Sequence, residues 1–293
     1  MENNYRLLTE FASKNNIKSI EFAPNDNSPL VAGEAKNNSL FLRPDDVIFR
    51  SVIENNQWDI ETINFFDSAL QKSKFEKIEF VDIGANIGLI SRQILGRFDN
   101  KINQVFCYEP SIENFIILNR NLSFSDKVKS FHYGLGNKSE EINLYKDPYN
   151  IGNYSTMNSD QLFGYLSTEE GVKYEGKNKV EQELIKIESI QKESKKWIES
   201  GNNIFFKSDT QGNDISIATS LPLEIWNNNI FACVMEIIPL ANNIFSLYRF
   251  SKILDLFERK AFVSNPQRPL STDEIIDYIE SMGLETNLIM TKN

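Results

Sequence analysis

The stretch Val81-Asp82-Ile83-Gly84-Ala85-Asn86-Ile87-Gly88 (81–88) decides the fold of this chain. It completes a short β-rich run, residues 78–83, and leads into residues 88–98, where apolar side chains recur at helical spacing. Gly84 permits backbone angles closed to other residues and lets a ligand approach the main chain, while Gly88 allows close packing where the helix starts. The first turn of that helix offers free N–H groups to a ligand. We therefore predict a strand, a ligand-binding turn and a helix.

The glycine spacing of this turn narrows the kind of ligand. Three residues separate Gly84 from Gly88, which is neither the dinucleotide fingerprint G-x-G-x-x-G nor a P-loop, and no G-K-[ST] follows. Asp82, two residues before the first glycine, suits a cationic ligand better than a pyrophosphate. A tight strand-to-helix turn without a ligand is the plain alternative.

A second polar segment, Tyr108-Glu109-Pro110-Ser111, follows the next predicted strand, residues 104–108. Glu109 comes roughly 25 residues after the turn, close to the spacing at which an acidic residue reaches a ribose diol. Pro110 pre-sets the chain direction, and Ser111 is suited to cap the helix that follows. A solvated or helix-capping acid is the alternative for Glu109.

A third segment, residues 205–214, runs from a hydrophobic strand into alternating charges and a glycine turn. Lys207 and Asp209 share a face because side chains repeat every two residues along a strand. We expect both at the strand end beside the predicted ligand turn, either as functional groups of the site or as a structural ion pair.

Strands alternate with helices from about residue 76 onward, with further strand candidates at 127–133, 203–207, 231–237 and 284–290. This rhythm predicts an α/β fold with a mostly parallel sheet covered by helices on both faces. Such sheets bind ligands at the carboxyl ends of their strands. We divide the chain into an N-terminal extension or cap, residues 1–75, and a main domain, residues 76–293.

Composition limits the partners and the compartment. The formal net charge of −10 repels phosphate backbones, and the lysines between Lys186 and Lys196 alternate with glutamates as on a solvated helix face. We therefore expect no nucleic-acid partner. The sequence contains no apolar run long enough for a membrane span, no secretory signal at its start, and two cysteines, Cys107 and Cys233, inside apolar runs. We expect a cytoplasmic protein with both thiols reduced and buried.

Four segments together resemble the FkbM family of methyltransferases. They are Val-Asp-Ile-Gly-Ala-Asn-Ile-Gly (81–88), Tyr-Glu-Pro (108–110), Asn-Ile-Gly-Asn-Tyr-Ser (150–155) and Lys-Ser-Asp-Thr-Gln-Gly-Asn-Asp (207–214). Asp45-Asp46-Val47-Ile48 with Trp58-Asp59 is similar to the usual lead-in of that family. Ser208 stands where the family usually has an aliphatic residue, and Asp214 stands where glutamate is common.

The resemblance implies a Rossmann-like class I methyltransferase fold with a seven-stranded sheet and S-adenosylmethionine as the methyl donor. It also implies O-methylation of a sugar, a glycan or a natural product. The turn would hold the methionine end of the cofactor, Glu109 the ribose, and Gly134-Leu135 the adenine. The cofactor-binding residues expected on this basis are Asp82, Gly84, Ala85, Asn86, Gly88, Glu109, Ser111, Gly134 and Leu135.

Methyl transfer to a hydroxyl needs an aligned acceptor and a general base. Asp209 is our first candidate for the base, with Lys207 orienting it or stabilising the developing alkoxide, and Glu236 is the second candidate. Asn153, Tyr154 and Ser155 are expected on the rim of the acceptor site. The only histidine, His132, is expected to be structural, and the spacing does not require a metal.

Two alternatives belong to other functional classes. A nicotinamide-dependent oxidoreductase could use a similar sheet, although the glycine spacing and Asp82 count against it. A non-catalytic protein could retain the same fold, since a fold alone does not establish an activity.

Overall fold

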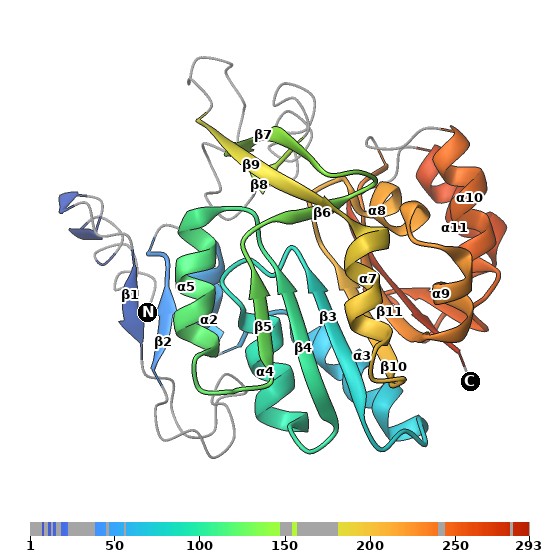
Figure 1. Cartoon of the computed structure of the whole chain (residues 1–293), viewed down its shortest axis with the longest axis horizontal. Coiled ribbons are helices and arrows are strands. Elements are labelled where there is room, and N and C mark those ends of the chain that lie inside the picture. The colour runs from blue at the N-terminus through green and yellow to red at the C-terminus, as the bar shows by residue number, and fades with distance from the viewer. Residues whose placement is uncertain are drawn as a thin grey trace.

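The computed structural model describes residues 8, 11–12, 14–15, 19–22, 39–44, 47–55, 57–146, 154–156, 181–239, 244–281 and 284–292. A seven-stranded sheet forms the centre, with the order β12–β13–β11–β10–β3–β4–β5 (Figure 1). Its strands are β3 (Ile78–Ile83), β4 (Ile102–Tyr108), β5 (Val128–Phe131), β10 (Asn203–Ser208), β11 (Ile230–Ile237), β12 (Arg259–Phe262) and β13 (Thr286–Thr291).

One strand of this sheet is reversed. β13 pairs antiparallel with both β11 and β12, whereas β10, β3, β4, β5 and β11 pair in parallel. Every residue of β3 and β11 is buried, as expected for parallel strands that helices cover on both faces. This strand order, with its single reversed strand, is the Rossmann-like class I methyltransferase fold, so the predicted fold class is confirmed.

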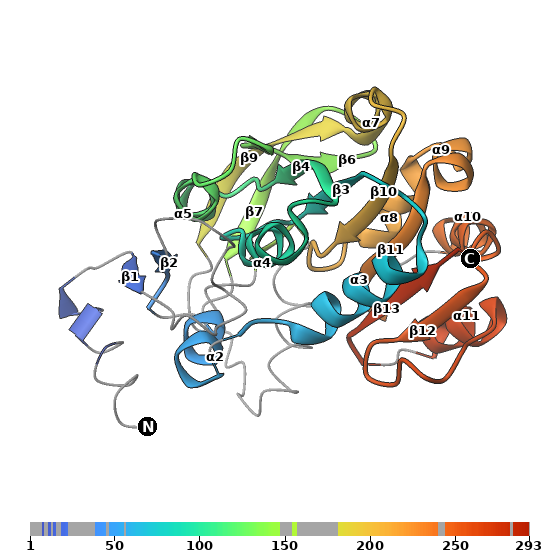
Figure 2. The same ribbon diagram turned by 90° about the horizontal axis from the view of Figure 1, so that it is seen from below.

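Two hydrophobic cores lie on opposite faces of the sheet (Figure 2). One core joins the sheet to the helices α3 (Ile60–Lys72), α4 (Leu89–Phe98) and α5 (Ile112–Leu122). The other joins it to α7 (Ile190–Ile198), α8 (Asp214–Ser220), α9 (Leu223–Asn228), α10 (Ile244–Leu254) and α11 (Thr272–Glu280). Neighbouring residues of one strand, such as Phe205 and Phe206, alternate between the two cores.

A second sheet of four strands stands over the carboxyl ends of β3, β4 and β5 (Figure 1). Its order is β6–β9–β7–β8, and we call it the roof sheet. The strands are β6 (Gly134–Gly136), β7 (Glu140–Lys146), β8 (Tyr154–Ser155) and β9 (Gln182–Ser189). A small apolar cluster of Leu144, Tyr154, Ile185 and Ile187 holds the roof sheet together.

The helix expected over Lys186–Lys196 is correct only in its second part. Residues up to Ser189 belong to β9, and α7 begins at Ile190. Ile185 and Ile187 are buried while Lys186 is exposed, which is the two-residue period of a strand. Lys186, Lys192 and Lys195 are exposed, first on a strand and then on a helix, but Glu188 and Glu193 are buried, so the predicted solvated face is wrong for these glutamates.

The N-terminal part contributes a two-stranded antiparallel ribbon, β1 (Ile20–Phe22) with β2 (Leu40–Leu42), and the helix α2 (Val47–Asn55). Leu40, Leu42 and Phe49 share a core with Ile117 of α5. Both cysteines are buried and unpaired, as predicted. Within the described residues, no helix has the length and apolarity to cross a membrane.

Candidate functional site

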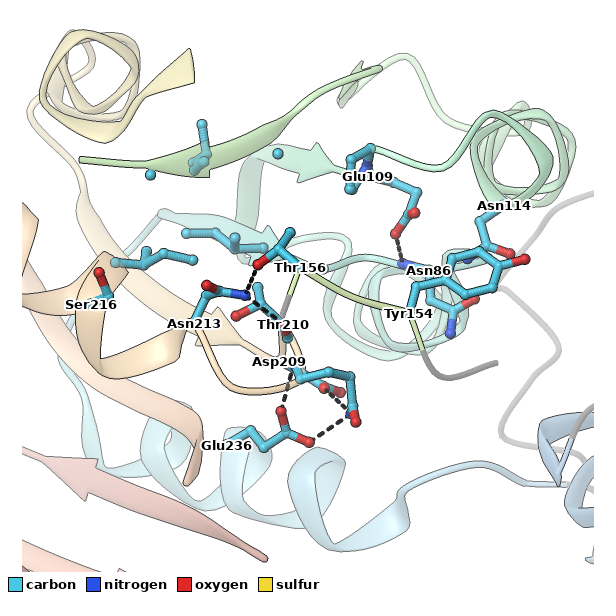
Figure 3. A pocket seen from close by; sticks show the side chains of 18 of the residues that line it. Asn86, Glu109, Asn114, Tyr154, Thr156, Asp209, Thr210, Asn213, Ser216 and Glu236 are labelled. Atoms are coloured by element: carbon cyan, nitrogen blue, oxygen red, sulfur yellow. Dashed lines mark hydrogen bonds between the residues drawn. The ribbon is translucent and has the colours of Figure 1, made fainter. Parts of the chain in front are cut away.

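A cavity of about 580 Å³ opens at the carboxyl ends of the sheet strands, below the roof sheet (Figure 3). Its wall comes from segments that lie far apart in the chain. The turn after β3, the end of β4, the residues after β10 and the end of β11 form one side, and β6, β7 and β8 of the roof sheet form another. α2 and the start of α3 contribute further wall residues. A volume of this size is typical of sites for small ligands.

The turn after β3 has the conformation that its sequence predicts. Gly84 has φ +70° and Asn86 has φ +51°, both in the left-handed region. A Cβ atom at Gly84 would lie 1.8 Å from the carbonyl oxygen of Asp209, because the N–H of Asp209 bonds the carbonyl of Ile83 at 3.0 Å. Glycine at position 84 thus lets the ends of β3 and β10 meet at the cavity.

Glu109, at the end of β4, lies in the cavity wall next to that turn. Its Oε2 accepts the N–H of Asn86 at 2.9 Å, and its Oε1 accepts the N–H of Ser111 at 2.9 Å. Burial raises the pKa of Glu109 to about 7, against the opposing effect of hydrogen bonds from Ser111, Asn86 and Asn114. The carboxylate therefore ties together the first two strand ends and keeps its position at the cavity.

Asp82, expected to serve the methionine end of a ligand through its amine or an ordered water, is not among the residues that line the cavity. It is fully buried, pairs with Nζ of Lys207 at 3.0 Å and accepts the hydroxyl of Ser91 at 2.6 Å. Lys207 also donates to the carbonyl of Gly84 at 2.9 Å and lies 3.7 Å from Oδ2 of Asp209. Burial lowers the pKa of Lys207, but Asp82 and Asp209 outweigh it, so the ammonium stays charged. Asp82 and Lys207 therefore hold the turn and Asp209 from behind.

Three other residues of the expected cofactor set also lie behind the wall rather than in it. Ala85 belongs to the core on the α3–α5 face, and a Cβ at Gly88 would touch Leu122 at 3.1 Å, so Gly88 permits helix packing. Ser111 is the N-cap of α5 as predicted, but its hydroxyl makes no capping bond. None of these three residues lines the cavity, so the geometry gives them no direct contact with a ligand there. Gly84, Asn86, Glu109, Gly134 and Leu135 of that set do line the cavity.

The catalytic candidates Asp209 and Glu236 both reach the cavity (Figure 3). Gln211 hydrogen-bonds to both of them. The side-chain amide of Gln211 donates to Glu236 at 2.7 Å and to Asp209 at 3.3 Å, and its backbone N–H donates to Glu236 at 2.8 Å. The side chain of Asp209 is 44% exposed, whereas Glu236 is buried. Burial, and then the charges of Asp209 and Asp214, raise the pKa of Glu236 well above its usual range.

Ser208 and Asp214, the two residues that differ from the FkbM pattern, form a hydrogen bond with each other. The hydroxyl of Ser208, at the end of β10, donates to Oδ1 of Asp214, and both residues are buried. Asp214 also accepts the N–H of Thr210 at 3.1 Å. An aliphatic residue at 208 would leave this carboxylate without that donor, so the serine and the aspartate form one structural unit under the turn at 209–213.

The expected acceptor rim is partly at the cavity. Tyr154 lines it, while Ser155 is buried and bonds the carbonyl of Gln211 at 2.8 Å. Asn153 lies outside the described residues. His132 is exposed and stacks on Phe115 with ring centroids 4.9 Å apart, in line with a structural role.

Sequence reasoning missed several wall residues. Asp59 is the N-cap of α3 and has φ +42°. Burial raises the pKa of Asp59, and the charge of Asp209 raises it further while that of Lys207 lowers it. Glu285 and Asn287, beside and within β13, also line the cavity. The Trp58-Asp59 pair was a usable signal, because both residues are in the wall. Nothing local marks Glu285 or Asn287, which reach the site only through the reversed strand.

The cavity has a strongly acidic wall. Among the described residues, six carboxylates line it and no lysine, arginine or histidine does. The amine of Lys207 lies 3.7 Å from the wall residue Asp209, but it is buried against Asp82. The carboxylates are Asp59, Glu109, Glu140, Asp209, Glu236 and Glu285.

Three solved proteins described as methyltransferases align with this chain at low sequence identity. Methyltransferase FkbM from Methylobacillus flagellatus KT aligns over 75% of this chain and 45% of its own, with 15% identity and a TM-score of 0.42. The S-adenosylmethionine-dependent O-methyltransferase from Thermotoga maritima aligns over 87% and 74%, with 10% identity and a TM-score of 0.32. A Pyrococcus horikoshii protein assigned to the RNA methyltransferases aligns over 99% and 96%, with 10% identity and a TM-score of 0.33.

This chain thus spans less than half the length of the FkbM structure. No family model and no curated protein matches the sequence.

Proposed function

We propose that this protein is an S-adenosylmethionine-dependent methyltransferase that methylates a hydroxyl group of a sugar, glycan or natural product. The observation that carries the proposal is the position of Glu109. Its carboxylate ends β4 in the cavity wall, beside the glycine turn that ends β3, on a sheet with the class I methyltransferase strand order. We also propose that the chain belongs to the FkbM family, on the four sequence segments quoted above.

The residues of the wall fit the proposed cofactor. Gly84 and Asn86 line the cavity where the methionine end would lie, Glu109 can accept ribose hydroxyls, and Gly134-Leu135 with Pro110 offers a mainly apolar place for the adenine. The acidic wall favours a ligand that carries a sulfonium and an ammonium. When bound, S-adenosylmethionine supplies an electrophilic methyl group.

Asp209 is our proposed general base. It ends β10 next to the Gly84 turn, and its side chain is the more accessible of the two candidates. The raised pKa of Glu236 favours its protonated form at neutral pH, so Glu236 would bind and orient rather than accept a proton. Lys207 and Gln211 hold the Asp209 carboxylate from two sides.

The acceptor we propose is a small molecule or a glycan rather than nucleic acid. With Glu236 protonated, the described wall still has five other acidic residues and no basic one, and with the net charge of −10 this opposes a phosphate-bearing acceptor, whereas carboxylates and amides are good partners for hydroxyl groups. The two buried, unpaired thiols fit the reducing conditions of the cytoplasm, which is the location we propose.

Calorimetric titration with S-adenosylhomocysteine tests the cofactor assignment. The wild-type protein should bind it, and Glu109→Ala should raise the Kd about tenfold or more, the loss of roughly 1.4 kcal/mol per decade. Glu224→Ala, at an exposed position of α9, is the control and should bind normally. Stabilisation by NAD or NADP but not by S-adenosylhomocysteine would instead support the oxidoreductase alternative.

Transfer of a labelled methyl group to a panel of neutral mono- and disaccharides tests the reaction and the base. We expect Asp209→Asn to retain cofactor binding and to lose at least about 100-fold in turnover, the usual contribution of a general base. Full turnover by Asp209→Asn would remove it as the base. Methylation of RNA but of no saccharide would contradict the acceptor class.

A further inference from the structure

Arg43 lies between β2 and α2, in the part of the chain that precedes the central sheet, and it is only 6% exposed. It is not part of the cavity wall. A buried guanidinium is costly unless several partners accept its N–H groups, so its contacts indicate what it holds in place. Two of these contacts are with residues that do line the cavity, Asn114 and Tyr154.

The first contact leads to Glu109. Nη1 of Arg43 donates to Oδ1 of Asn114 at 2.9 Å, and both residues are buried. Because a guanidinium can only donate, Asn114 must turn its carbonyl oxygen toward Arg43, which leaves its amide N–H groups for the other side. The Asn114 amide is also one of the groups that lower the pKa of Glu109, after the backbone N–H groups of Ser111 and Asn86. Asn114 and Glu109 both line the cavity, on the side where α5 follows β4 (Figure 3).

The second contact leads to the roof sheet. Nη1 of Arg43 also donates to the hydroxyl of Tyr154 at 2.6 Å. The Tyr154 hydroxyl lies 3.3 Å from a carboxylate oxygen of Glu113, which Lys146 of β7 holds at 3.1 Å. Arg43 therefore bonds both to Asn114 of α5 and to Tyr154 of β8, and so connects α5 to the roof sheet.

Other residues already dock the N-terminal ribbon on α5. Asn121 exchanges two hydrogen bonds with the backbone of Phe41, at 2.7 and 2.9 Å, and the guanidinium of Arg120 lies over the Phe41 ring at 5.3 Å. Asn121 also donates to the carbonyl of Ile87 at 2.7 Å, beside the wall residue Asn86, but none of these contacts is with a residue that lines the cavity. The separate bonds of Arg43 to Asn114 and Tyr154 are therefore not needed for docking alone.

We propose that Arg43 is a positioning residue for the cofactor site: through Asn114 it orients the carboxylate of Glu109, and through Tyr154 it holds the roof sheet over that carboxylate. The proposal rests on the proposed function, because it assigns the purpose of these bonds to cofactor binding. It also makes the N-terminal part of the chain a component of the site rather than a separate cap.

The ionisation of Glu109 reports on this arrangement. Its pKa of about 7 reflects burial, which raises it, and the donors Ser111, Asn86 and Asn114, which lower it. Two other titratable groups face it, Lys207 from β10, which lowers the pKa, and the Tyr154 phenol from β8. Removing Arg43 frees Asn114 to turn away, so Glu109 loses a donor and its pKa rises. A carboxylate that accepts ribose hydroxyls would then be present over a narrower pH range.

The test uses Arg43→Gln in the full chain, with Arg120→Gln as a matched control. Both variants remove an arginine between the N-terminal ribbon and α5, but only Arg43 bonds to wall residues. Calorimetry should show the Kd for S-adenosylhomocysteine raised roughly tenfold in Arg43→Gln at pH 7, and unchanged in Arg120→Gln. Arg43→Lys keeps the charge but not the fork of donors, and it should recover only part of the affinity. It also serves if Arg43→Gln folds poorly.

Carbon-13 NMR of the Glu109 carboxyl group in the ligand-free protein gives a reading that does not need the cofactor. Its titration midpoint should move upward by roughly half a pH unit or more in Arg43→Gln and stay in place in Arg120→Gln. In an Asn114→Leu background, Arg43→Gln should shift this midpoint little further, because the path through the amide is already cut, whereas any effect on the Kd that acts through Tyr154 should remain.

Each outcome is decisive for one proposal. An unchanged Glu109 midpoint and Kd in Arg43→Gln, an equal effect of Arg120→Gln, or a full midpoint shift in the Asn114→Leu background would overturn the role of Arg43. A wild-type protein that ignores S-adenosylhomocysteine would overturn the proposed function, while the ligand-free titration would still show whether Arg43 orients Glu109.

Discussion

Backbone conformations that cost energy gather at the cavity. In the described part of the chain, three residues other than glycine have positive φ: Asp59, Asn86 and Gln211. All three line the cavity. Asn86 donates to the carboxylate of Glu109, Gln211 donates to that of Glu236, and Asp59 is itself an acidic residue of the wall. Such conformations persist where the surrounding structure imposes them, and they are common in binding sites. At the residue scale, the strain supports the choice of this cavity as the working site.

Gly84→Ala tests the meeting of β3 and β10. The added Cβ would lie 1.8 Å from the carbonyl oxygen of Asp209, and φ is +70°. We expect a loss of several kcal/mol in unfolding free energy, or failure to fold, since a backbone atom cannot yield like a flexible side chain. Gly201→Ala is the matched control: its φ is +73° with nothing within 4 Å of the Cβ, so it should cost about 1 kcal/mol. Equal losses in urea unfolding would show that the close approach does not matter.

The roof sheet lines the cavity, although no local sequence pattern predicted it as a sheet. β9 follows β7 in the chain only after residues 147–180, of which the structure describes 154–156, yet it pairs with both β6 and β7. Glu183 of β9 also accepts the N–H of Ile112, at the start of α5, at 3.0 Å. A carboxylate at a helix start is favourable, so the roof sheet both covers the cavity and caps the helix that carries Asn114.

Ile185→Ala tests the stability of the roof sheet. Ile185 is 3% exposed in the small roof cluster, while its neighbour Leu184 points outward at 66% exposure. We expect Ile185→Ala to cost about 2–4 kcal/mol locally, because it leaves a cavity in a small core. Hydrogen exchange should accelerate in β7 and β9 but not in β3 and β4. Leu184→Ala should change little; an equal effect would mean that the cluster does not hold the sheet.

At the scale of the whole molecule, α3 is built into the central core. Phe66 is fully buried with its ring centroid 4.1 Å from that of Phe205, and Ile63 and Leu70 share the same core with Phe80. The boundary we drew after residue 75 stays a prediction about independent folding. The packing favours an earlier boundary, before α3.

Two truncated chains test that boundary. A chain of residues 76–293 lacks α3 and would expose the aromatic face formed by Phe80 and Phe205, whereas a chain of residues 57–293 keeps it covered. We expect the shorter chain to melt at a clearly lower temperature and to bind a hydrophobic dye, since burying each large side chain is worth about 1.5–3 kcal/mol. Equal melting temperatures would place the boundary where the sequence suggested.

The local sequence determined the framework of the site. The apolar run before Gly84, the glycine turn and the acid after β4 are consecutive features, and parallel strands bring their carboxyl ends to one edge whatever the rest of the chain does. The fold class and the positions of Gly84, Asn86, Glu109 and Asp209 at the cavity follow from this. Tertiary structure decided which side chains face the cavity. Asp82 faces the buried amine of Lys207, and Asp59, Asn114 and Glu285 reach the wall through helix packing and a reversed strand. Those contacts join residues far apart in the chain, and no local period encodes them.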